Sequence, residues 1–423
     1  MSVLPLNLLP DTTTVTREGS ASIGGCDLVE LAERHGTPLF VYDVAHLRAR
    51  AAEAVAAFGD GAVYASKAFL CRAVARLVHE EGMRIDVATG GELHVALSAG
   101  VPAERLVMHG NNKSPAELRM ALEAGVGRLV VDNFDELDRL AELTQGLETR
   151  PRIHLRVTPG VEAHTHEYIS TGQDDSKFGF TVSTGAATEA VKRARAIPGL
   201  ELVGVHAHIG SQVFRADSHA RALEVVASFS EPLGLSELSI GGGLGVAYVE
   251  GESAPSITEW AEAIHSKAAE LGVEARLFAE PGRAIVAAAA VTLYRVGTIK
   301  RIPGVRTYVA VDGGMSDNPR PVLYGSGYET FLPRATDRPR TLPIRLVGKH
   351  CESGDLLVRE GLLPDDVVVG DIVATPVTGA YGQSMGSNYN KVLRPAVVFV
   401  EGGTDRLVVR RESYDDLLAT DLG

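Results

Sequence analysis

Chemically versatile side chains recur at the ends of short apolar segments between residues 60 and 285. They are Lys67, Asp86, His109, Asn133, Arg156, His206, His208, Glu280 and Arg283. Lys67 ends the segment VYASK. Apolar neighbours lower the pKa of a lysine, which favours Schiff-base formation. A strand-end lysine can also extend its amine into solvent, so this residue alone leaves both interpretations open.

A glycine-rich segment, residues 241–245, follows another apolar segment. It lacks the dinucleotide-binding pattern because position 246 is Val, and it lacks the Gly-Lys-Ser/Thr of a P-loop. The backbone N–H groups of such a turn can bind a phosphate. Glu280 precedes Pro-Gly-Arg, and its carboxylate could face a protonated ring nitrogen or form a salt bridge with Arg283.

His206 and His208 are two residues apart, a spacing that places both side chains on one face of a strand. Such a pair could bind a metal, with His109 and Asp86 as further ligands, as in a metal-dependent hydrolase. It could also stack on a flat cofactor. A histidine that only packs in the core is the third interpretation for one of the two.

Eight short apolar segments alternate with helix-like segments, a pattern typical of a (β/α)8 barrel. The predicted strands are 62–67, 84–89, 105–110, 128–133, 152–157, 202–208, 237–242 and 276–282. Ser114 is predicted to cap one of the helices, and a longer amphipathic helix is predicted over 256–271, ended by Gly272. A doubly wound open sheet is the competing fold. In a barrel, the carboxyl ends of the strands form the catalytic rim, and phosphate sites often follow strands seven and eight. The barrel fold therefore predicts that the polar side chains at the strand ends lie close together at this rim.

The fifth unit contains an insertion, residues 158–184, with His164 and His166. Loops of this length in compact domains are often functional. We hypothesise that it forms a lid over the substrate.

The pattern changes after about residue 290 to short strand-like segments separated by turns, which predicts an all-β domain. The segments are 305–311, 342–347, 356–358, 371–375, 396–400 and 406–410. Leu39-Phe40-Val41 could pair with this domain. We therefore predict an α/β plus all-β fold: a (β/α)8 barrel over residues 43–288, with residues 1–42 and 289–423 forming a β-sandwich or β-barrel domain.

Composition narrows the class of protein. The 423 residues carry a formal net charge of -13, which is poorly suited to nucleic acid. The longest apolar stretch, about residues 284–294, is too short to span a bilayer. Met1–Pro10 lacks the basic start of a signal peptide. Three scattered cysteines do not form a disulfide framework. We expect a cytoplasmic protein that binds neither nucleic acid nor membrane.

A Schiff-base lysine, a phosphate-binding turn, a carboxylate for a ring nitrogen and a stacking histidine on one barrel rim together indicate pyridoxal 5′-phosphate. The motifs YASKAF, HGNNKS, EAHTHEYISTGQDDSKFGF, HAHIGSQ, GGGLG, EPGR, DGGMSDNPRPVLYG, GKHCESGD and GAYGQSMGSNYN resemble those of the diaminopimelate decarboxylases. These are barrel-type pyridoxal-phosphate enzymes related to ornithine decarboxylase and alanine racemase. The resemblance extends over nearly the whole chain, in order.

The resemblance implies roles for individual residues. The residues implied to bind the cofactor are Lys67, His208, Ser211, Gly243, Glu280, Gly282, Arg283 and Tyr381. Those implied to bind the substrate are Arg283, Arg320, Tyr324, Glu352 and Tyr381. Lys67, His208 and Cys351 are implied to be catalytic, with Cys351 as the acid that protonates the product. Cys351 and Glu352 are implied to enter the site from the second subunit of a homodimer. No metal is expected.

The resemblance further implies decarboxylation of meso-2,6-diaminopimelate to L-lysine and carbon dioxide, the last step of lysine biosynthesis. One alternative is a paralogue that acts on ornithine, arginine, D-lysine or a carboxypolyamine. Others are a racemase, the metal-dependent hydrolase and a non-enzymatic cofactor carrier. A second substrate carboxylate would require Arg320, whereas a simple diamine would not.

Overall fold

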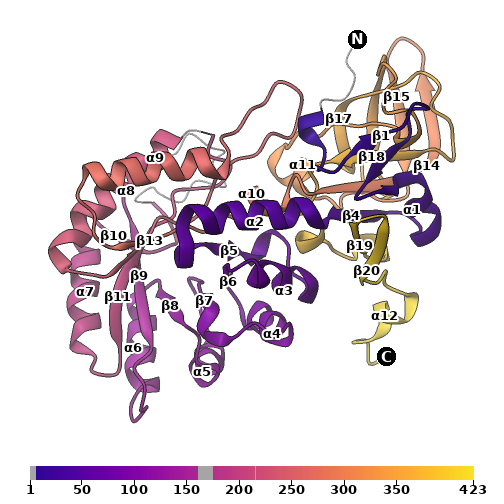
Figure 1. Cartoon of the computed structure of the whole chain (residues 1–423). Helices are drawn as coiled ribbons and strands as arrows, with labels where there is room; N and C mark the ends of the chain where they lie inside the picture. Colours follow the sequence, from indigo (N-terminus) through magenta and orange to yellow (C-terminus); the bar gives the residue numbers. More distant parts are fainter. Residues whose placement is uncertain (1–5, 161–174, 215) are drawn as a thin grey trace. The chain divides into compact units, whose positions relative to one another are not determined.

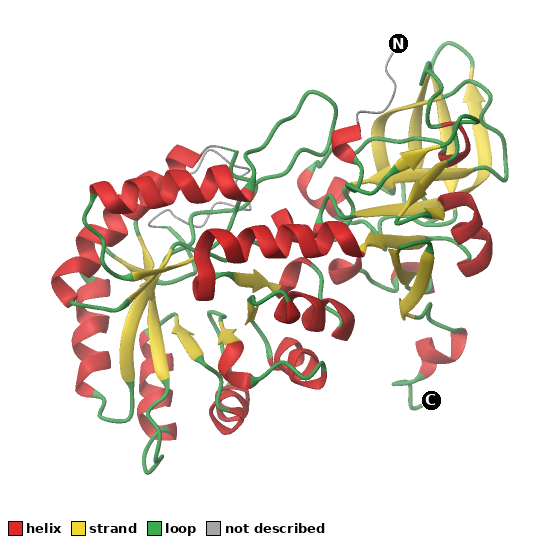
Figure 2. Ribbon diagram, viewed as in Figure 1, coloured by secondary structure: helices red, strands yellow, loops and turns green. Residues whose placement is uncertain are grey.

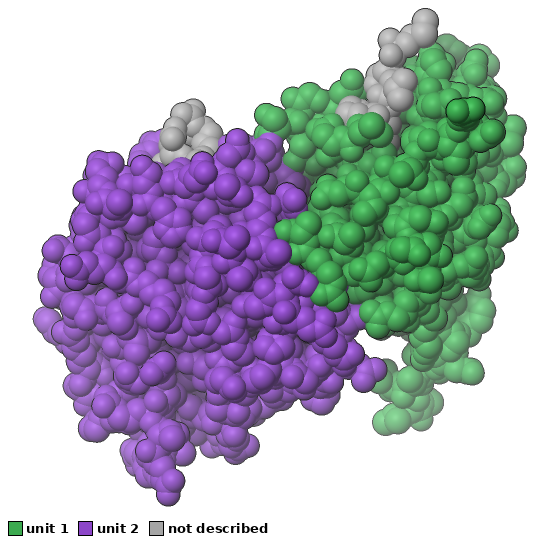
Figure 3. All heavy atoms as spheres, in the orientation of Figure 1, with its two compact units in different colours: residues 1–49, 247–253, 285–423 green, residues 50–246, 254–284 purple. Residues whose placement is uncertain are grey.

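The computed structural model describes residues 6–160, 175–214 and 216–423. The chain divides into two compact units (Figure 3). The barrel unit comprises Arg50–Val246 and Ala254–Ala284, and the β unit comprises Met1–Ala49, Ala247–Ser253 and Ile285–Gly423. Residues 161–174, which include most of the hypothesised lid, lie outside the described residues.

The barrel unit contains eight parallel strands at the predicted places (Figures 1 and 2). They are β5 (Val63–Ala65), β6 (Arg84–Val87), β7 (Leu106–Met108), β8 (Arg128–Val131), β9 (Arg152–Thr158), β11 (Glu201–His206), β12 (Glu237–Ser239) and β13 (Arg276–Phe278). The first and last strands meet, because Val63 N donates to Ala279 O at 2.9 Å and Ala279 N donates to Gly61 O at 3.0 Å. The (β/α)8 prediction is confirmed. A short extra strand, β10 (Phe180–Thr181), pairs with β9 after the insertion.

Helices follow the strands. They are α3 (Arg72–Glu80), α4 (Gly90–Ser98), α5 (Pro115–Ala124), α6 (Phe134–Leu143), α7 (Ala186–Ala196), α8 (Ala216–Ser230) and α9 (Ile257–Glu270), preceded by α2 (Val44–Phe58). Ser114 and Ser256 form the capping boxes of α5 and α9, and the cap at Ser114 was predicted. Asn133 also proves to be a helix cap: its Oδ1 accepts from Glu136 N at 3.0 Å. This side chain therefore has a structural use at the rim.

The barrel interior holds Val63, Val107, Val130 and Phe278 in one apolar cluster. Nearer the amino ends of the strands lies a buried ion pair. Glu237 accepts from Arg128 Nε at 2.6 Å and lies 2.7 Å from His154 Nε2. These charged groups are desolvated, and each is hydrogen-bonded, as buried charges must be.

The β unit is built on an eight-stranded mixed sheet, with the order β17-β16-β15-β14-β4-β19-β20 and β18 paired to β14. Its strands are β4 (Leu39–Asp43), β14 (Ala290–Ile302), β15 (Arg306–Val311), β16 (Leu342–Val347), β17 (Leu356–Leu363), β18 (Ile372–Pro376), β19 (Ala396–Glu401) and β20 (Thr404–Val409). β4 pairs with β14 and β19, as predicted for Leu39–Val41. Sequence analysis missed β14, because its first half is an unbroken buried run without alternation.

Smaller elements complete the β unit. They are β1 (Thr14–Val15), β2 (Ala21–Ile23), β3 (Cys26–Asp27), α1 (Leu28–His35), α11 (Arg320–Tyr324) and α12 (Tyr414–Leu418). The short helix α10 (Arg283–Val286) begins in the barrel unit and ends in the β unit. Within the described residues, no helix combines the length and apolar character needed to cross a membrane.

Candidate active site

The carboxyl ends of the barrel strands bring several predicted residues together. Lys67 lies in a 3-10 turn directly after β5, and its side chain is exposed. Its charge acts on Asp86 and on His208. Burial raises the pKa of Asp86 to about 6, a rise that His109 and Lys67 limit and Glu280 reinforces. A lysine amine and two further titratable groups thus share this rim.

Glu280 is the most highly connected carboxylate of the rim. It is 7% exposed and follows β13 by two residues. Ser239 Oγ donates to its Oε1 at 3.0 Å, and His206 Nε2 lies 3.0 Å from its Oε2. His109 Nε2 lies 3.4 Å from Oε1. Burial alone would raise the pKa of Glu280, but the two histidines hold it well below its ordinary value.

The histidine pair separates, contrary to the expectation that both lie on one strand face. β11 ends at His206, so the chain turns before His208. His206 contacts Glu280, whereas His208 Nδ1 accepts from Gly242 N at 3.2 Å. A Cβ on Gly241 would lie 2.9 Å from His208 Nδ1. The glycine turn therefore lies against the His208 ring.

The glycine turn is built for close backbone approach. Gly243 has a φ of 108°, and a Cβ there would collide with the carbonyl oxygen of Gly210. Arg283 follows β13, the barrel strand that comes after this turn in the chain. Its Nη2 donates to Ser211 Oγ at 2.9 Å. A hydroxyl and a buried guanidinium side by side offer two donors to an anion. Among the described residues Glu280 pairs with His206, His109 and Ser239, and not with its sequence neighbour Arg283.

Gly282 completes the barrel part of the site. A Cβ on Gly282 would lie 2.8 Å from both the Cβ and the carbonyl oxygen of Ala65. Only glycine therefore allows the turn after β13 to pack on the end of β5, next to Lys67. A carboxylate held ionised, a glycine turn and an anion-binding pair fit pyridoxal phosphate, with its ring nitrogen and its phosphate.

His109, His206 and Glu280 also form a group that could hold a metal ion. The chemistry available at this rim is thus wider than one cofactor, because two imidazoles and a carboxylate are ordinary ligands for zinc. In the structure the histidines instead contact the carboxylate directly, and their rings meet edge to face at 4.9 Å.

Five of the predicted residues belong to the β unit. Arg320, at the start of α11, is buried; its Nη1 donates to Tyr328 OH at 2.6 Å, and its guanidinium lies 4.3 Å from the ring centre of Tyr248. Tyr324 ends the same helix and is half-buried. Tyr381 is also half-buried. Two tyrosines thus orient Arg320.

Cys351 and Glu352 are exposed on a loop after β16. Cys351 N donates to Asn390 Oδ1 at 3.0 Å. The buried Asp355 accepts from His350 N at 2.9 Å and from Met315 N at 2.6 Å. The thiol is therefore presented to the surroundings on a loop that buried hydrogen bonds hold in place.

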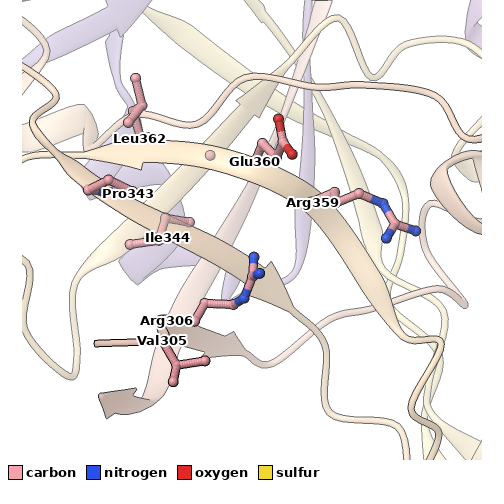
Figure 4. A pocket seen from close by; sticks show the side chains of 8 residues that line it. Val305, Arg306, Pro343, Ile344, Arg359, Glu360 and Leu362 are labelled. Carbon is pink, nitrogen blue, oxygen red and sulfur yellow. The ribbon is translucent and has the colours of Figure 1, made fainter. Parts of the chain in front are cut away.

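Sequence analysis missed Ser239, Tyr248 and Tyr328. Ser239 ends β12 directly beside His206 in the strand pairing, but the predicted strand ran on to residue 242, so the only available signal was a polar residue within an apolar run. The two tyrosines follow no local pattern. A separate hollow of the β unit, lined by eight residues of β15, β16, β17 and their surroundings, contains none of the predicted site residues (Figure 4).

Comparisons with known proteins agree with this chemistry. A family model described as the pyridoxal-binding domain of pyridoxal-dependent decarboxylases matches residues 44–287. A diaminopimelate decarboxylase of Halalkalibacterium halodurans is 48% identical over 97% of both chains. One from Mycobacterium tuberculosis is 47% identical over 98% of both. The crystal structure of diaminopimelate decarboxylase from M. jannaschii in co-complex with L-lysine has 33% identity and a TM-score of 0.90, covering 98% of each chain.

The family model matches the barrel, and the relatives match nearly the whole chain. Both findings agree with a rim that is suited to a ring nitrogen and a phosphate. The chain therefore belongs to the diaminopimelate decarboxylase family of pyridoxal-dependent decarboxylases, and its cofactor is pyridoxal 5′-phosphate.

Proposed function

We propose that the protein decarboxylates meso-2,6-diaminopimelate to L-lysine and carbon dioxide, the last step of lysine biosynthesis. The single observation that supports this most strongly is identity of 48% with a diaminopimelate decarboxylase over 97% of both chains. The rim chemistry agrees, because amine, carboxylate and anion-binding groups converge there. The three free cysteines suit the reducing cytoplasm, where we place the enzyme.

Bound pyridoxal phosphate supplies an electron sink for the electron pair that remains when the bond to carbon dioxide breaks. Lys67 would hold the cofactor through its amine, and His208 would stack on its ring. Glu280 would accept the N–H of the ring nitrogen. The residues that would bind the phosphate are Ser211, Gly243, Gly282 and Arg283, and Tyr381 would also contact the cofactor.

Substrate binding would use charged and phenolic side chains. Arg283, Arg320, Tyr324, Glu352 and Tyr381 are the proposed contacts. A guanidinium binds a carboxylate through two parallel hydrogen bonds, and the tyrosines beside Arg320 hold that guanidinium in one orientation. This suits a substrate with a second carboxylate, far from the reacting carbon.

After carbon dioxide leaves, the reacting carbon requires one proton. Cys351 is the proposed donor: its S–H bond breaks, the proton goes to the carbon, and a thiolate remains to be reprotonated from solvent. The thiol is exposed on a loop that hydrogen bonds hold in place, which suits a residue that acts in the active site of the partner subunit. We therefore propose a homodimer in which Cys351 and Glu352 complete the partner's site.

The dimer proposal has a direct test. Chains with Lys67→Ala and chains with Cys351→Ala are each inactive alone. When their subunits are mixed and exchange randomly, one intact site forms in each mixed dimer, and activity recovers to about a quarter of the wild-type level. No recovery despite demonstrated subunit exchange would overturn the shared site.

The reaction is tested by an end-point assay with mass spectrometry. The protein loaded with pyridoxal phosphate receives meso-diaminopimelate, ornithine, arginine, L-lysine and D-lysine in parallel. Lysine formed from diaminopimelate alone, and lost in Lys67→Ala, supports the proposal. Turnover of another amino acid would assign a paralogous decarboxylase. Loss of chirality without carbon dioxide would assign a racemase.

A further inference from the structure

The side chains that contact Glu280 come from other parts of the barrel. Glu280 lies at the carboxyl ends of the strands, and its partners His206, Ser239 and His109 lie at or directly after the ends of β11, β12 and β7. Of the residues that the structure describes, its ion-pair partners are histidines, not arginine or lysine. A carboxylate so deeply buried normally requires a full opposite charge or several hydrogen bonds to stay ionised.

His206 is suited to supply a hydrogen bond without supplying a charge. It is 1% exposed, and burial lowers its pKa to about 4, so the ring is neutral near pH 7. A neutral imidazole carries one N–H, and Nε2 is the nitrogen that faces Glu280. The ionised carboxylate has no proton to give, so the proton belongs to Nε2. His206 thus donates to Glu280 without adding a positive charge, and the imidazole that can carry a charge beside the carboxylate is that of His109, whose pKa Glu280 and Asp86 raise.

Ser239 secures the other oxygen. Its Oγ donates to Oε1 of Glu280 at 3.0 Å, and Ser239 pairs with His206 across the adjacent strands. With one donor on each oxygen, the carboxylate plane has a single favourable orientation. The groups whose charges also act on this site are His109, Asp86 and Arg156.

We propose that His206, supported by Ser239, is a positioning residue: it holds Glu280 as an ionised carboxylate in one orientation and so makes the site select a cofactor with a protonated ring nitrogen. This inference rests on the proposed role of Glu280 toward pyridoxal phosphate. It goes further because it assigns the selectivity to residues that lie behind the carboxylate.

The test compares two ligands of the purified protein. One is pyridoxal phosphate, and the other is its 1-deaza analogue, in which a C–H group replaces the ring nitrogen. Equilibrium dialysis gives the dissociation constant of each, and their ratio measures selection of the ring nitrogen. A loss of structure weakens both ligands alike, so the ratio responds only to the environment of that nitrogen.

His206→Met removes the donor but keeps a long apolar side chain, whereas His206→Gln keeps an N–H at a similar reach. A hydrogen bond to a charged group contributes about 1.5–3 kcal/mol, so the ratio falls about 10- to 100-fold in His206→Met. His206→Gln keeps most of the ratio. Ser239→Ala lowers it by a smaller factor and supplies a second measurement if His206→Met does not fold.

The matched control is His154→Met. His154 is also buried and lies 2.7 Å from a glutamate, Glu237, but at the amino ends of the strands. This variant loses thermal stability and keeps the wild-type ratio. An unchanged ratio in folded His206→Met would overturn the inference. A wild-type protein that binds both ligands equally would instead overturn the proposed role of Glu280, and the inference with it.

Discussion

The barrel buries one glutamate near each end of its strands, and the two charges are balanced in different ways. Glu237, at the amino ends, pairs with Arg128 and His154. Glu280, at the carboxyl ends, contacts two histidines and a serine. The first group is neutral overall without any ligand. Among the described residues the second has histidines in place of the arginine, and only His109, whose pKa Glu280 and Asp86 raise, opposes the carboxylate with a titratable charge, so the carboxylate can accept a further cationic partner. One end is therefore organised for stability and the other for chemistry.

The largest expected effect concerns the neutral end. Arg128→Met leaves Glu237 buried with His154 alone, which should destabilise the protein by about 3–5 kcal/mol. Turnover per folded molecule should not change. Denaturant unfolding and kcat measure the two quantities. The control is Arg276→Met, whose partner Asp60 is 41% exposed, where the loss should stay below about 1 kcal/mol. Comparable losses of stability in Arg128→Met and Arg276→Met would contradict the view that the buried Glu237 depends on its arginine.

The second effect concerns the reactive end. Glu280→Gln should lower kcat by about 10²- to 10³-fold, as when one preorganised electrostatic group is removed. Its thermal stability should fall as well, because the histidines stabilise the ionised carboxylate in the folded state, so kcat is compared per folded molecule. Glu237→Gln is the matched substitution and should keep kcat. If both variants lose kcat equally, the division between the two ends is wrong.

The third effect is a pH dependence of stability. Burial alone would raise the pKa of Glu237, but hydrogen bonds from Arg128 and His154 hold it well below its ordinary value of 4.5. The unfolded chain therefore binds more protons than the folded one. The stabilisation is complete above about pH 4.5 and is lost as the pH falls through the lower, folded pKa.

Thermal melting of wild type and Glu237→Gln across this range measures that loss. The wild type should lose more stability on acidification, so the two curves should converge at low pH. The exposed Glu201 provides a control, since Glu201→Gln should follow the wild-type curve. Parallel curves for all three proteins would show that Glu237 is not held ionised.

The smallest effect concerns the N-cap of α9, which is expected to contribute to stability and not to catalysis. Ser256 caps α9 and accepts from Glu259 N at 3.1 Å. Ser256→Ala should cost about 1 kcal/mol of stability and leave kcat and cofactor affinity unchanged. Ser256→Asp retains a capping oxygen and should restore stability. A drop in kcat for Ser256→Ala would mean that the reactive end extends further than Glu280 and its neighbours.

Much of the fold could be predicted from local patterns. The eight barrel strands were recognisable because each is a short apolar run followed by a helix signal, and α5 and α9 were marked by Ser114 and Gly272. β14 escaped because its first residues are all buried, and a run without alternation is compatible with either helix or strand. Asn133 was placed at the rim, but its use as a helix cap depends on the backbone that follows.

The chemistry of the site divides in the same way. The sequence by itself determined the barrel, the glycine turn and the candidate residues Lys67, His208 and Glu280, because these depend on residue types and near-neighbour spacing. Only the tertiary structure decided that His206 serves Glu280 while His208 lies against the glycine turn. The partners of Glu280 lie 74 residues away at His206 and 41 away at Ser239. Strand pairing and barrel closure bring such distant residues together, and no local periodicity specifies which atoms then meet.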